Sequence, residues 1–406
     1  MKKILILGVG AQGSTVARRM DEEPKVAEII CADYDEKAVN ELVKDLKKAR
    51  GMKIDASKIE EIVAAAKGVD LIINALPLAF GPNVLEAAIE AKTNYQDFAA
   101  TDALTDNWVD GIKLMYTEYS RRFAENGKTA IIGTGSAPGL ICVVARNAMR
   151  YLDTCETIYN IVYEGVEAKR FLPFWWSPIT ALSDMSEDAY AYVNGEIIRT
   201  KPFSDPIYRK YDYLDEEVRL VEHAHDEPLH MGLNAEKFFK GAKNIYFKYG
   251  GAGVNFSEPL YRAGLLSRKP VEVDGVKVIP FNFVLKHLPP APKYKEEIKE
   301  IIEEGLVSDT GSMVVEAIGT KDGKKVLVES HVFAPGLVES FERSGLTAEM
   351  YLTGQGGALF TKMFVEDLYT QKGLISSDML TFEQVDYYLE QAKKLDITVN
   401  VEVKEL

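Results

Sequence analysis

The stretch that most constrains the fold is the beginning of the chain, where an apolar run, "ILIL", leads directly into "GVGAQG". The three glycines of this G-x-G-x-x-G pattern are followed by an amphipathic helix pattern, "STVARRMDEE". A strand, a glycine loop and a helix in this order are typical of a dinucleotide-binding domain, whose pyrophosphate lies at the helix N-terminus. We therefore predict that the loop binds the cofactor through Gly8, Gly10, Ala11, Gln12 and Gly13.

Strand and helix patterns continue to alternate as far as residue 145. Five further runs have the composition of strands, and most are separated from the next by helical periodicity. They are "AEIICAD", "GMKID", "VDLIINALP", "NYQDFA" and "TAIIGTG". Strands that alternate with helices through short loops predict a doubly wound parallel sheet of the Rossmann type in an α/β domain over residues 1–150.

The periodicity changes after residue 150, where "TIYNIVYEG" alternates as a half-buried strand does. Further on, "KDGK" separates two alternating runs, which is typical of a β-hairpin. Residues 151–340 are therefore predicted to form an α+β domain with a mostly antiparallel sheet. Helical patterns return afterwards, and residues 341–406 are predicted to be helices that pack back on the first domain.

Composition excludes several classes of protein. The net charge of −14 and the lack of a Lys/Arg run argue against nucleic acid as a partner. No apolar stretch has the length that a membrane span needs, and the N-terminal apolar run is too short for a signal peptide. The three cysteines lack CxxC spacing, which argues against structural zinc and fits reduced thiols. We expect a cytoplasmic protein without a membrane or metal partner.

An acidic residue at the end of the second predicted strand indicates which dinucleotide is bound. Asp33 lies twenty residues after Gly13, where a carboxylate accepts hydrogen bonds from the adenosine ribose and repels a 2′-phosphate. The residues that follow, beginning with Tyr34, bring no basic side chain. We predict that Asp33 and Tyr34 line the adenosine end of the site, with NAD as the cofactor and NADP less favoured.

Other strand ends supply the remaining cofactor candidates, because ligands of open α/β sheets bind at the carboxyl ends of the strands. Asn74, Leu76 and Pro77 belong to "NALP" at the end of the fourth predicted strand, and we predict that they lie near the nicotinamide ribose. Asp55, after the third strand, either contacts the adenine or caps the next helix. Asp97 ends the fifth strand and is a candidate for contacting the ribose or the substrate amine.

The order of these motifs resembles the saccharopine dehydrogenase family, which includes saccharopine reductases, lysine 6-dehydrogenases and carboxynorspermidine dehydrogenases. The resemblance rests on "GVGAQGS", "CADYDEKA", "KIDASKIEEIVAAAKGVDLIINALP", "NYQDFA", "IIGTGSAPGL" and "YLTGQGGALFTKMFVEDLYTQKGLISSDML". It covers residues 1–150 and about 345–385, and is only topological between them. Saccharopine reductases commonly carry an acidic residue before the Pro-Gly of "GSAPG", where this chain has Ala137 before Pro138. In this respect the chain is more similar to the NAD-dependent lysine 6-dehydrogenases.

The resemblance implies a Rossmann domain interrupted by an α+β substrate domain. It implies hydride transfer with a nicotinamide at a C–N bond of an amino acid or a polyamine-like amine, in lysine or related amino-acid metabolism. Pro138 is included among the cofactor-binding candidates on the same ground. Members of the family often pair through the sheet of the second domain, so a homodimer is expected.

Oxidation of an amine needs a proton acceptor, because the amine must be neutral before hydride leaves. Three of the five histidines fall in "EHAHDEPLH", where a neighbouring carboxylate can raise the basicity of an imidazole. His225 is, with Asp97, the predicted catalytic group, while His223 and Glu227 are predicted to bind substrate. A solvated loop and a metal site remain alternatives for this cluster.

The remaining substrate candidates lie in the aromatic segment "RFLPFWW". Arg170 could bind a substrate carboxylate through its bidentate fork, and Trp175 could close over the substrate. A core plug is the alternative for the aromatic residues. At the level of function, an opine- or homoserine-type dehydrogenase and a non-enzymatic NAD-binding sensor remain alternatives to the amine dehydrogenase.

Overall fold

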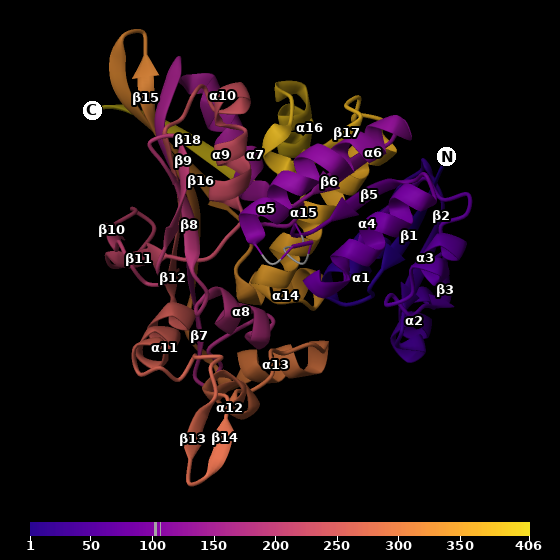
Figure 1. Cartoon of the computed structure of the whole chain (residues 1–406), viewed down its shortest axis with the longest axis horizontal. Coiled ribbons are helices and arrows are strands. Elements are labelled where there is room, and N and C mark those ends of the chain that lie inside the picture. Colours follow the sequence, from indigo (N-terminus) through magenta and orange to yellow (C-terminus); the bar gives the residue numbers. More distant parts are fainter. Residues whose placement is uncertain (101–103, 106) are drawn as a thin grey trace. The chain divides into compact units, whose positions relative to one another are not determined.

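The structure, a computed structural model, describes every residue except 101–103 and 106. The chain divides into two compact units, which comprise residues 1–147 with 351–395, and residues 148–350 with 396–406. Each unit is built around one large β-sheet (Figure 1). The chain therefore leaves the first unit after residue 147 and returns to it at residue 351.

The sheet of the first unit has seven strands, all parallel, in the order β17-β6-β5-β4-β1-β2-β3. The strands are β1 (Lys2–Leu7), β2 (Val26–Asp33), β3 (Ala49–Lys53), β4 (Leu71–Asn74), β5 (Asn94–Asp97), β6 (Thr129–Ile132) and β17 (Gly373–Ser376). The order of the strands reverses between β1 and β4, which is where open α/β sheets bind their ligands.

Two apolar clusters, one built on Leu5 and Ile72 and the other on Ile4 and Ile73, form the core of this unit. Successive residues of a strand point to opposite faces, so these alternating members show that both faces of the sheet are covered. The longer helices of the unit are α1 (Ala11–Glu22), α2 (Glu36–Val43), α3 (Ile59–Ala65), α4 (Gly81–Glu90), α5 (Trp108–Leu114), α6 (Ser120–Glu125), α7 (Leu140–Ala148), α15 (Ala348–Val365) and α16 (Phe382–Lys393).

Helix α15 packs closely against the loops of the sheet because its sequence carries "GQGG". A Cβ atom added to Gly354 would lie 2.8 Å from the side chain of Thr15 in α1. One added to Gly356 would lie 2.8 Å from the carbonyl oxygen of Gly135. These approaches are closer than a larger residue allows, so glycine is required for the C-terminal segment to join the first unit.

The second unit contains a nine-stranded mixed sheet, whose main path is β10-β11-β12-β7-β15-β16-β18. Strand β12 runs parallel to β7, and the other pairs along this path are antiparallel. The strands are β7 (Thr154–Ala168), β8 (Ala189–Val193), β9 (Glu196–Thr200), β10 (Ile207–Arg209), β11 (Val218–Glu222), β12 (Asn244–Gly251), β15 (Leu306–Lys321), β16 (Lys324–Phe333) and β18 (Thr398–Glu405). The hairpin predicted at "KDGK" joins β15 to β16.

The helices of this unit connect the strands, and a separate two-stranded ribbon of β13 (Val271–Val273) and β14 (Val276–Val278) accompanies them. The helices are α8 (Pro178–Asp184), α9 (Glu227–Leu233), α10 (Ala235–Phe238), α11 (Ala252–Arg262), α12 (Pro280–His287), α13 (Lys295–Glu304) and α14 (Leu337–Ser344). In the part of the chain that the structure describes, no helix is long and apolar enough to cross a membrane.

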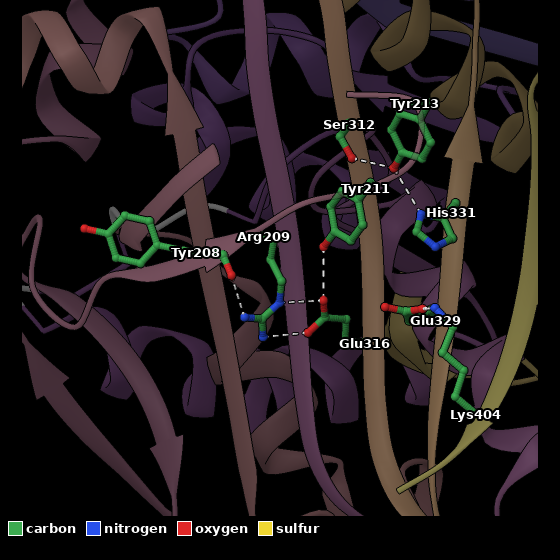
Figure 2. Close-up of polar contacts among 9 residues, drawn as sticks. All are labelled: Tyr208, Arg209, Tyr211, Tyr213, Ser312, Glu316, Glu329, His331 and Lys404. Carbon is green, nitrogen blue, oxygen red and sulfur yellow. Dashed lines mark hydrogen bonds and ion pairs between the residues drawn. The ribbon is translucent and has the colours of Figure 1, made fainter. Parts of the chain in front are cut away.

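The end of β10 and the segment after it are held against the sheet by polar contacts (Figure 2). The guanidinium of Arg209 donates to both carboxylate oxygens of Glu316, at 2.7 and 2.8 Å, and the hydroxyl of Tyr211 donates to the same carboxylate at 3.1 Å. Nearby, the hydroxyl of Tyr213 lies 3.0 Å from Nδ1 of His331 on β16. Glu316 is thus a charged residue that can be buried because its oxygens are paired.

The predicted fold class is confirmed, since a parallel sheet of the Rossmann type is combined with a largely antiparallel sheet in a second unit. The tail differs from the prediction of helices alone. Residues 373–376 add the seventh strand, β17, to the first sheet, and β18 pairs with β16 in the second. Residues 396–406 therefore belong to the second unit rather than to the first.

Candidate functional site

The register of the parallel sheet brings the predicted cofactor residues to one edge. Leu7, directly before the glycine loop, pairs with Asn74, and Asn74 pairs with Asp97. Gly133 follows β6, and its backbone N–H donates to Oδ1 of Asp97 at 2.8 Å. The carboxyl ends of four strands are thus adjacent, as a cofactor crevice in this class of sheet requires.

The glycine loop has the shape that the sequence predicts. Gly8 has a φ of +90°, and a Cβ atom there would lie 2.6 Å from the carbonyl oxygen of Ala75. A Cβ atom on Gly13 would lie 1.9 Å from the carbonyl oxygen of Gly8, so α1 can approach the loop only through glycine. Gly10 differs, because a Cβ atom there would have nothing within 4 Å. The space beside Gly10 fits a group that approaches the backbone, such as a pyrophosphate at the N-terminus of α1.

The other loop residues lie at the start of α1. Ala11 is the first residue of this helix, and Gln12 is the second. Among the described residues, Oε1 of Gln12 is buried without a hydrogen-bond partner. An unsatisfied buried oxygen is costly unless a ligand or water pairs with it, which favours a polar ligand at this position.

Asp33 lies beside the glycine loop rather than at a distance from it. Its Oδ2 accepts from the backbone N–H of Val9 at 2.9 Å, and its Oδ1 accepts from that of Asp35 at 3.1 Å. Tyr34 is 76% exposed, so its ring is open to solvent next to this carboxylate. Each carboxylate oxygen can accept a second hydrogen bond, so Asp33 can still receive a ribose hydroxyl.

Asp55 serves its own loop. Its Oδ1 accepts from both the backbone N–H and the hydroxyl of Ser57, at 3.0 and 2.6 Å, and these bonds lower the pKa of the carboxyl. These bonds lie within the loop before α3, whose N-cap residue is Lys58, so Asp55 does not cap this helix. The adenine contact of Asp55 stays a prediction.

At the end of β4, the side chain of Asn74 shapes the "NALP" turn, because its Oδ1 accepts from the backbone N–H of Leu76 at 3.2 Å. Pro77 precedes the short helical turn Leu78–Phe80. Pro138 follows a cis peptide bond in the loop after β6, where its ring would lie 3.2 Å from a Cβ atom on Gly133. The structure therefore places Leu76, Pro77 and Pro138 in the loops that follow β4 and β6, as the sequence predicts.

The second unit contains a buried cluster around the predicted histidines. His225 Nδ1 lies 2.5 Å from Oε2 of Glu227, and its ring is stacked on Phe247 with centroids 3.9 Å apart. His223 lies next to it, with ring centroids 5.8 Å apart, and Nδ1 of His223 is 3.0 Å from the carbonyl oxygen of Ala224. Because a carbonyl can only accept, Nδ1 of His223 carries the proton and Nε2 is an acceptor. The solvated-loop alternative is therefore wrong, as His223 is 3% exposed and Glu227 is fully buried.

The two imidazoles differ in their protonation. Burial and the charge of His225 lower the pKa of His223 to about 3, so His223 is neutral at neutral pH. Burial also opposes the charged form of His225, but the Glu227 carboxylate outweighs it and raises the pKa of His225 above its ordinary value. The pair can hold a proton near neutral pH, whereas His223 can only accept a hydrogen bond.

Two residues that the sequence did not indicate, Tyr249 and Glu164, extend this cluster together with Trp176 of the aromatic segment. The ring of Tyr249 on β12 lies 4.6 Å from that of His223, and the Tyr249 hydroxyl donates to the carboxylate of Glu164 on β7. The side chain of Trp176 is also hydrogen-bonded to Glu164. Burial raises the pKa of Glu164 above its ordinary value, although the hydrogen bonds from Tyr249 and Trp176 lower it in part. A continuous series of contacts therefore connects Glu227 with Trp176. It passes through His225, His223, Tyr249 and Glu164.

Two predicted substrate residues have structural roles instead. The indole of Trp175 is 4% exposed, donates to the carbonyl oxygen of Val166 at 2.9 Å and packs in an apolar cluster, so it is a core residue. The neighbouring Trp176 contacts the polar cluster. Arg170 directs its guanidinium to Glu304 and, at 3.2 Å, to Glu300 on α13. Its fork is used within the unit, so we do not retain Arg170 as the carboxylate site.

A metal site was the third alternative for the histidine cluster. Within the described ranges, no group of three or more His, Cys, Asp or Glu side chains has an arrangement that could hold a metal ion. The three cysteines, Cys31, Cys142 and Cys155, are buried and form no disulfide. Burial raises the pKa of the Cys31 and Cys155 thiols to about 12, so neither provides a thiolate ligand at neutral pH.

The fold and the glycine loop define the class of the protein as a nicotinamide-dinucleotide-binding oxidoreductase of the Rossmann type. Residues 4–131 match the family described as saccharopine dehydrogenase NADP binding domain. Carboxynorspermidine synthase from Vibrio alginolyticus is 26% identical over 426 aligned residues, covering 98% of this chain and 96% of its own. The same enzyme from Vibrio cholerae is 27% identical, covering 93% of this chain and 92% of its own. Residues 4–131 therefore match a saccharopine dehydrogenase-type dinucleotide-binding domain, and nearly the whole chain is similar to the two carboxynorspermidine synthases.

Solved structures share the whole fold. Apo saccharopine dehydrogenase (L-Glu forming) from Saccharomyces cerevisiae aligns over 100% of both chains with a TM-score of 0.70 at 14% identity. Homospermidine synthase from Legionella pneumophila, in complex with NAD, aligns over 100% of this chain and 91% of its own, with a TM-score of 0.62 at 11% identity. At these identities the likeness shows the fold alone.

Replacing two glycines of the loop should have different consequences. Gly10→Ala should fold normally, because the added Cβ atom meets nothing, yet weaken NADH binding by about tenfold or more if the pyrophosphate approaches this backbone. Gly13→Ala should instead lower the melting temperature, because its Cβ atom would overlap the backbone of Gly8. Thermal unfolding and fluorescence titration with NADH measure the two effects. Normal NADH binding by folded Gly10→Ala would contradict the placement of the pyrophosphate.

Acid should destabilise the second unit through its neutral histidines. Burial lowers the pKa values of His223 and His230 to about 3. When the protein unfolds below the ordinary histidine pKa of about 6.5, each of these two histidines therefore takes up a proton. As the pH decreases, each of these histidines should lower the free energy of unfolding by up to about 1.4 kcal/mol per pH unit. The raised pKa of His225 acts oppositely, giving stability that is lost as the pH rises through it.

The variant His230→Met isolates one of these protons. Between about pH 7 and about pH 5, it should lose less stability than the wild type in urea unfolding, because one proton uptake is removed. His287→Met is the matched control, since His287 lies in the exposed part of α12. An equal loss of stability on acidification in His230→Met and in the wild type would show that His230 does not titrate as its burial requires.

Proposed function

We propose that the chain is an NAD-dependent oxidoreductase that transfers hydride at a C–N bond of an amino acid or of a carboxylated polyamine. The observation that carries the proposal is the similarity, over more than 90% of both chains, to two carboxynorspermidine synthases. The glycine loop and Asp33 supply the cofactor site that such a reaction needs. Lysine 6-dehydrogenase-like and saccharopine dehydrogenase-like activities fall within the same proposal.

The chemistry sets what the residues must do. When an amine is oxidised, hydride passes from the carbon to the nicotinamide, the C–N bond becomes an imine and a proton is released from nitrogen. The reverse direction reduces an imine and takes up a proton. The protein must therefore orient the amine, exclude competing water and provide a group that exchanges a proton near neutral pH.

The cluster of the second unit has groups for two of these tasks, proton exchange and orientation of the amine. We assign proton exchange to His225, because Glu227 raises its pKa and fixes its ring through Nδ1. His223 is assigned to orient the amine, since its buried Nε2 is an acceptor without a hydrogen-bond partner among the described residues. The second carboxylate oxygen of Glu227, Oε1, is also buried without a hydrogen-bond partner among the described residues. Amine N–H groups would satisfy such acceptors, whose burial alone is unfavourable.

Glu164 and its aromatic neighbours suit the distal part of the substrate. A half-buried carboxylate beside the rings of Trp176 and Tyr249 can pair with an ammonium group through charge and through the aromatic faces. Asp97 remains the candidate of the first unit for contacting the nicotinamide ribose or the amine. The substrate is in either case a small molecule.

We propose NAD rather than NADP because of Asp33. Its carboxylate lies 2.9 Å from the N–H of Val9 in the loop, where a 2′-phosphate on the ribose would be repelled. A homodimer and a cytoplasmic location are also proposed. The homodimer is supported by the family resemblance, and the cytoplasmic location by three buried cysteines that form no disulfide.

A substrate panel tests the proposed function. The purified full chain is incubated with NAD and lysine, ornithine, saccharopine, diaminopimelate or carboxynorspermidine, and the absorbance of NADH is followed. Turnover of one of these amines, with its loss in His225→Asn, is the expected result. Binding of NADH without turnover of any compound would contradict the proposal and favour the non-enzymatic sensor, whereas turnover of hydroxy or opine substrates would favour the other dehydrogenases.

The cofactor preference is tested by removing one charge. Asp33→Asn should raise the KM for NAD by about tenfold and reduce the preference for NAD over NADP, because it removes the charge that repels a 2′-phosphate. Asp35→Asn is the matched control, since Asp35 caps α2 through the N–H groups of Lys37 and Ala38 and asparagine caps equally well. An unchanged ratio of NAD to NADP use in Asp33→Asn would exclude this role.

A further inference from the structure

A tyrosine inside β5 connects two of the candidate cofactor residues. The side-chain N–H of Asn74 donates to the hydroxyl oxygen of Tyr95 at 3.1 Å, and the Tyr95 hydroxyl donates to Oδ2 of Asp97 at 2.9 Å. Tyr95 is 0% exposed, and the other two side chains are also buried. The three residues therefore form one chain of hydrogen bonds across the ends of β4 and β5.

The chain of hydrogen bonds has a fixed direction. Burial and the neighbouring carboxylate raise the pKa of Tyr95 well above its ordinary value, so its hydroxyl keeps the proton and donates it to Asp97. The hydroxyl oxygen must then be the acceptor for Asn74, which turns the amide so that its Oδ1 meets the N–H of Leu76. One phenol thus sets the orientation of both the Asn74 amide and the Asp97 carboxylate.

We propose that Tyr95 is a positioning residue for the nicotinamide half of the cofactor site. This inference rests on the proposed function, since it takes "NALP" and Asp97 as the residues beside the nicotinamide ribose. The adenosine half is held by different elements, the glycine loop after β1 and Asp33 at the end of β2. Loss of the Tyr95 hydroxyl should therefore affect one half of the dinucleotide and leave the other half unchanged.

The experiment compares two ligands on the full-length variant Tyr95→Phe. NADH, which carries both halves, should bind about tenfold more weakly than to the wild type, because Asn74 loses its acceptor and Asp97 loses a donor. ADP, which carries only the adenosine half and the pyrophosphate, should bind with unchanged affinity. Fluorescence titration and calorimetry measure the two dissociation constants. A general loss of structure in the variant would weaken the binding of both NADH and ADP.

The matched control is Tyr119→Phe, which removes a tyrosine hydroxyl that donates to Glu86 on α4 at 2.9 Å. It should leave the binding of both ligands unchanged. If Tyr95→Phe does not fold, Asn74→Ala removes the other end of the same chain and is expected to give the same selective loss of NADH affinity.

Three other outcomes would overturn a proposal. Equal weakening of NADH and ADP in the folded variant would overturn the role of Tyr95, and so would unchanged NADH binding. A wild-type protein that binds ADP but not NADH would overturn the proposed function itself.

Discussion

The register of the parallel sheet in the first unit is the constraint on which the candidate cofactor site depends. Because Leu7 pairs with Asn74 and Asn74 with Asp97, the loops that follow three strands begin side by side. Parallel strands place all their carboxyl ends at the same edge, so a residue that directly follows any of them joins the same site. A shift of one residue in β4 would turn Asn74 to the opposite face and break its bond to Tyr95.

This constraint explains why much of the cofactor site can be predicted from the sequence. Strand ends are visible as the end of an apolar run, so Gly8, Asp33, Asn74 and Asp97 can be found without knowing the packing. Tyr95 cannot be found in this way, because in "NYQDFA" it has the pattern of an ordinary core residue. Only the position of its hydroxyl, between two strand ends, gives it a further role.

The C-terminal segment illustrates a second limit. The sequence predicts helices there, and α15 and α16 form, but β17 and β18 depend on partners that are distant in the sequence, β6 in one sheet and β16 in the other. The glycines of "GQGG" are explained only by the neighbours that they approach, such as Thr15 and the backbone of Gly135. Long-range packing of this kind leaves little local signal in a sequence.

Long-range contacts also limit which residues of the cluster in the second unit can be predicted from the sequence. His223, His225 and Glu227 are close in the sequence and form a visible local pattern, whereas Glu164 and Tyr249 come together through the parallel pairing of β7 and β12. Trp175 and Trp176 are adjacent outside regular structure, where no periodicity tells which ring is buried in the core.

The electrostatics of this cluster explain why its two histidines differ in protonation. The charge of His225 opposes a charge on the neighbouring His223, and the Glu227 carboxylate contacts His225. The proton therefore belongs to His225, and His223 is forced to remain a neutral acceptor. Burying Nε2 of His223 and Oε1 of Glu227 without a hydrogen-bond partner among the described residues is unfavourable, so the cluster is suited to a ligand that brings N–H groups to these two acceptors.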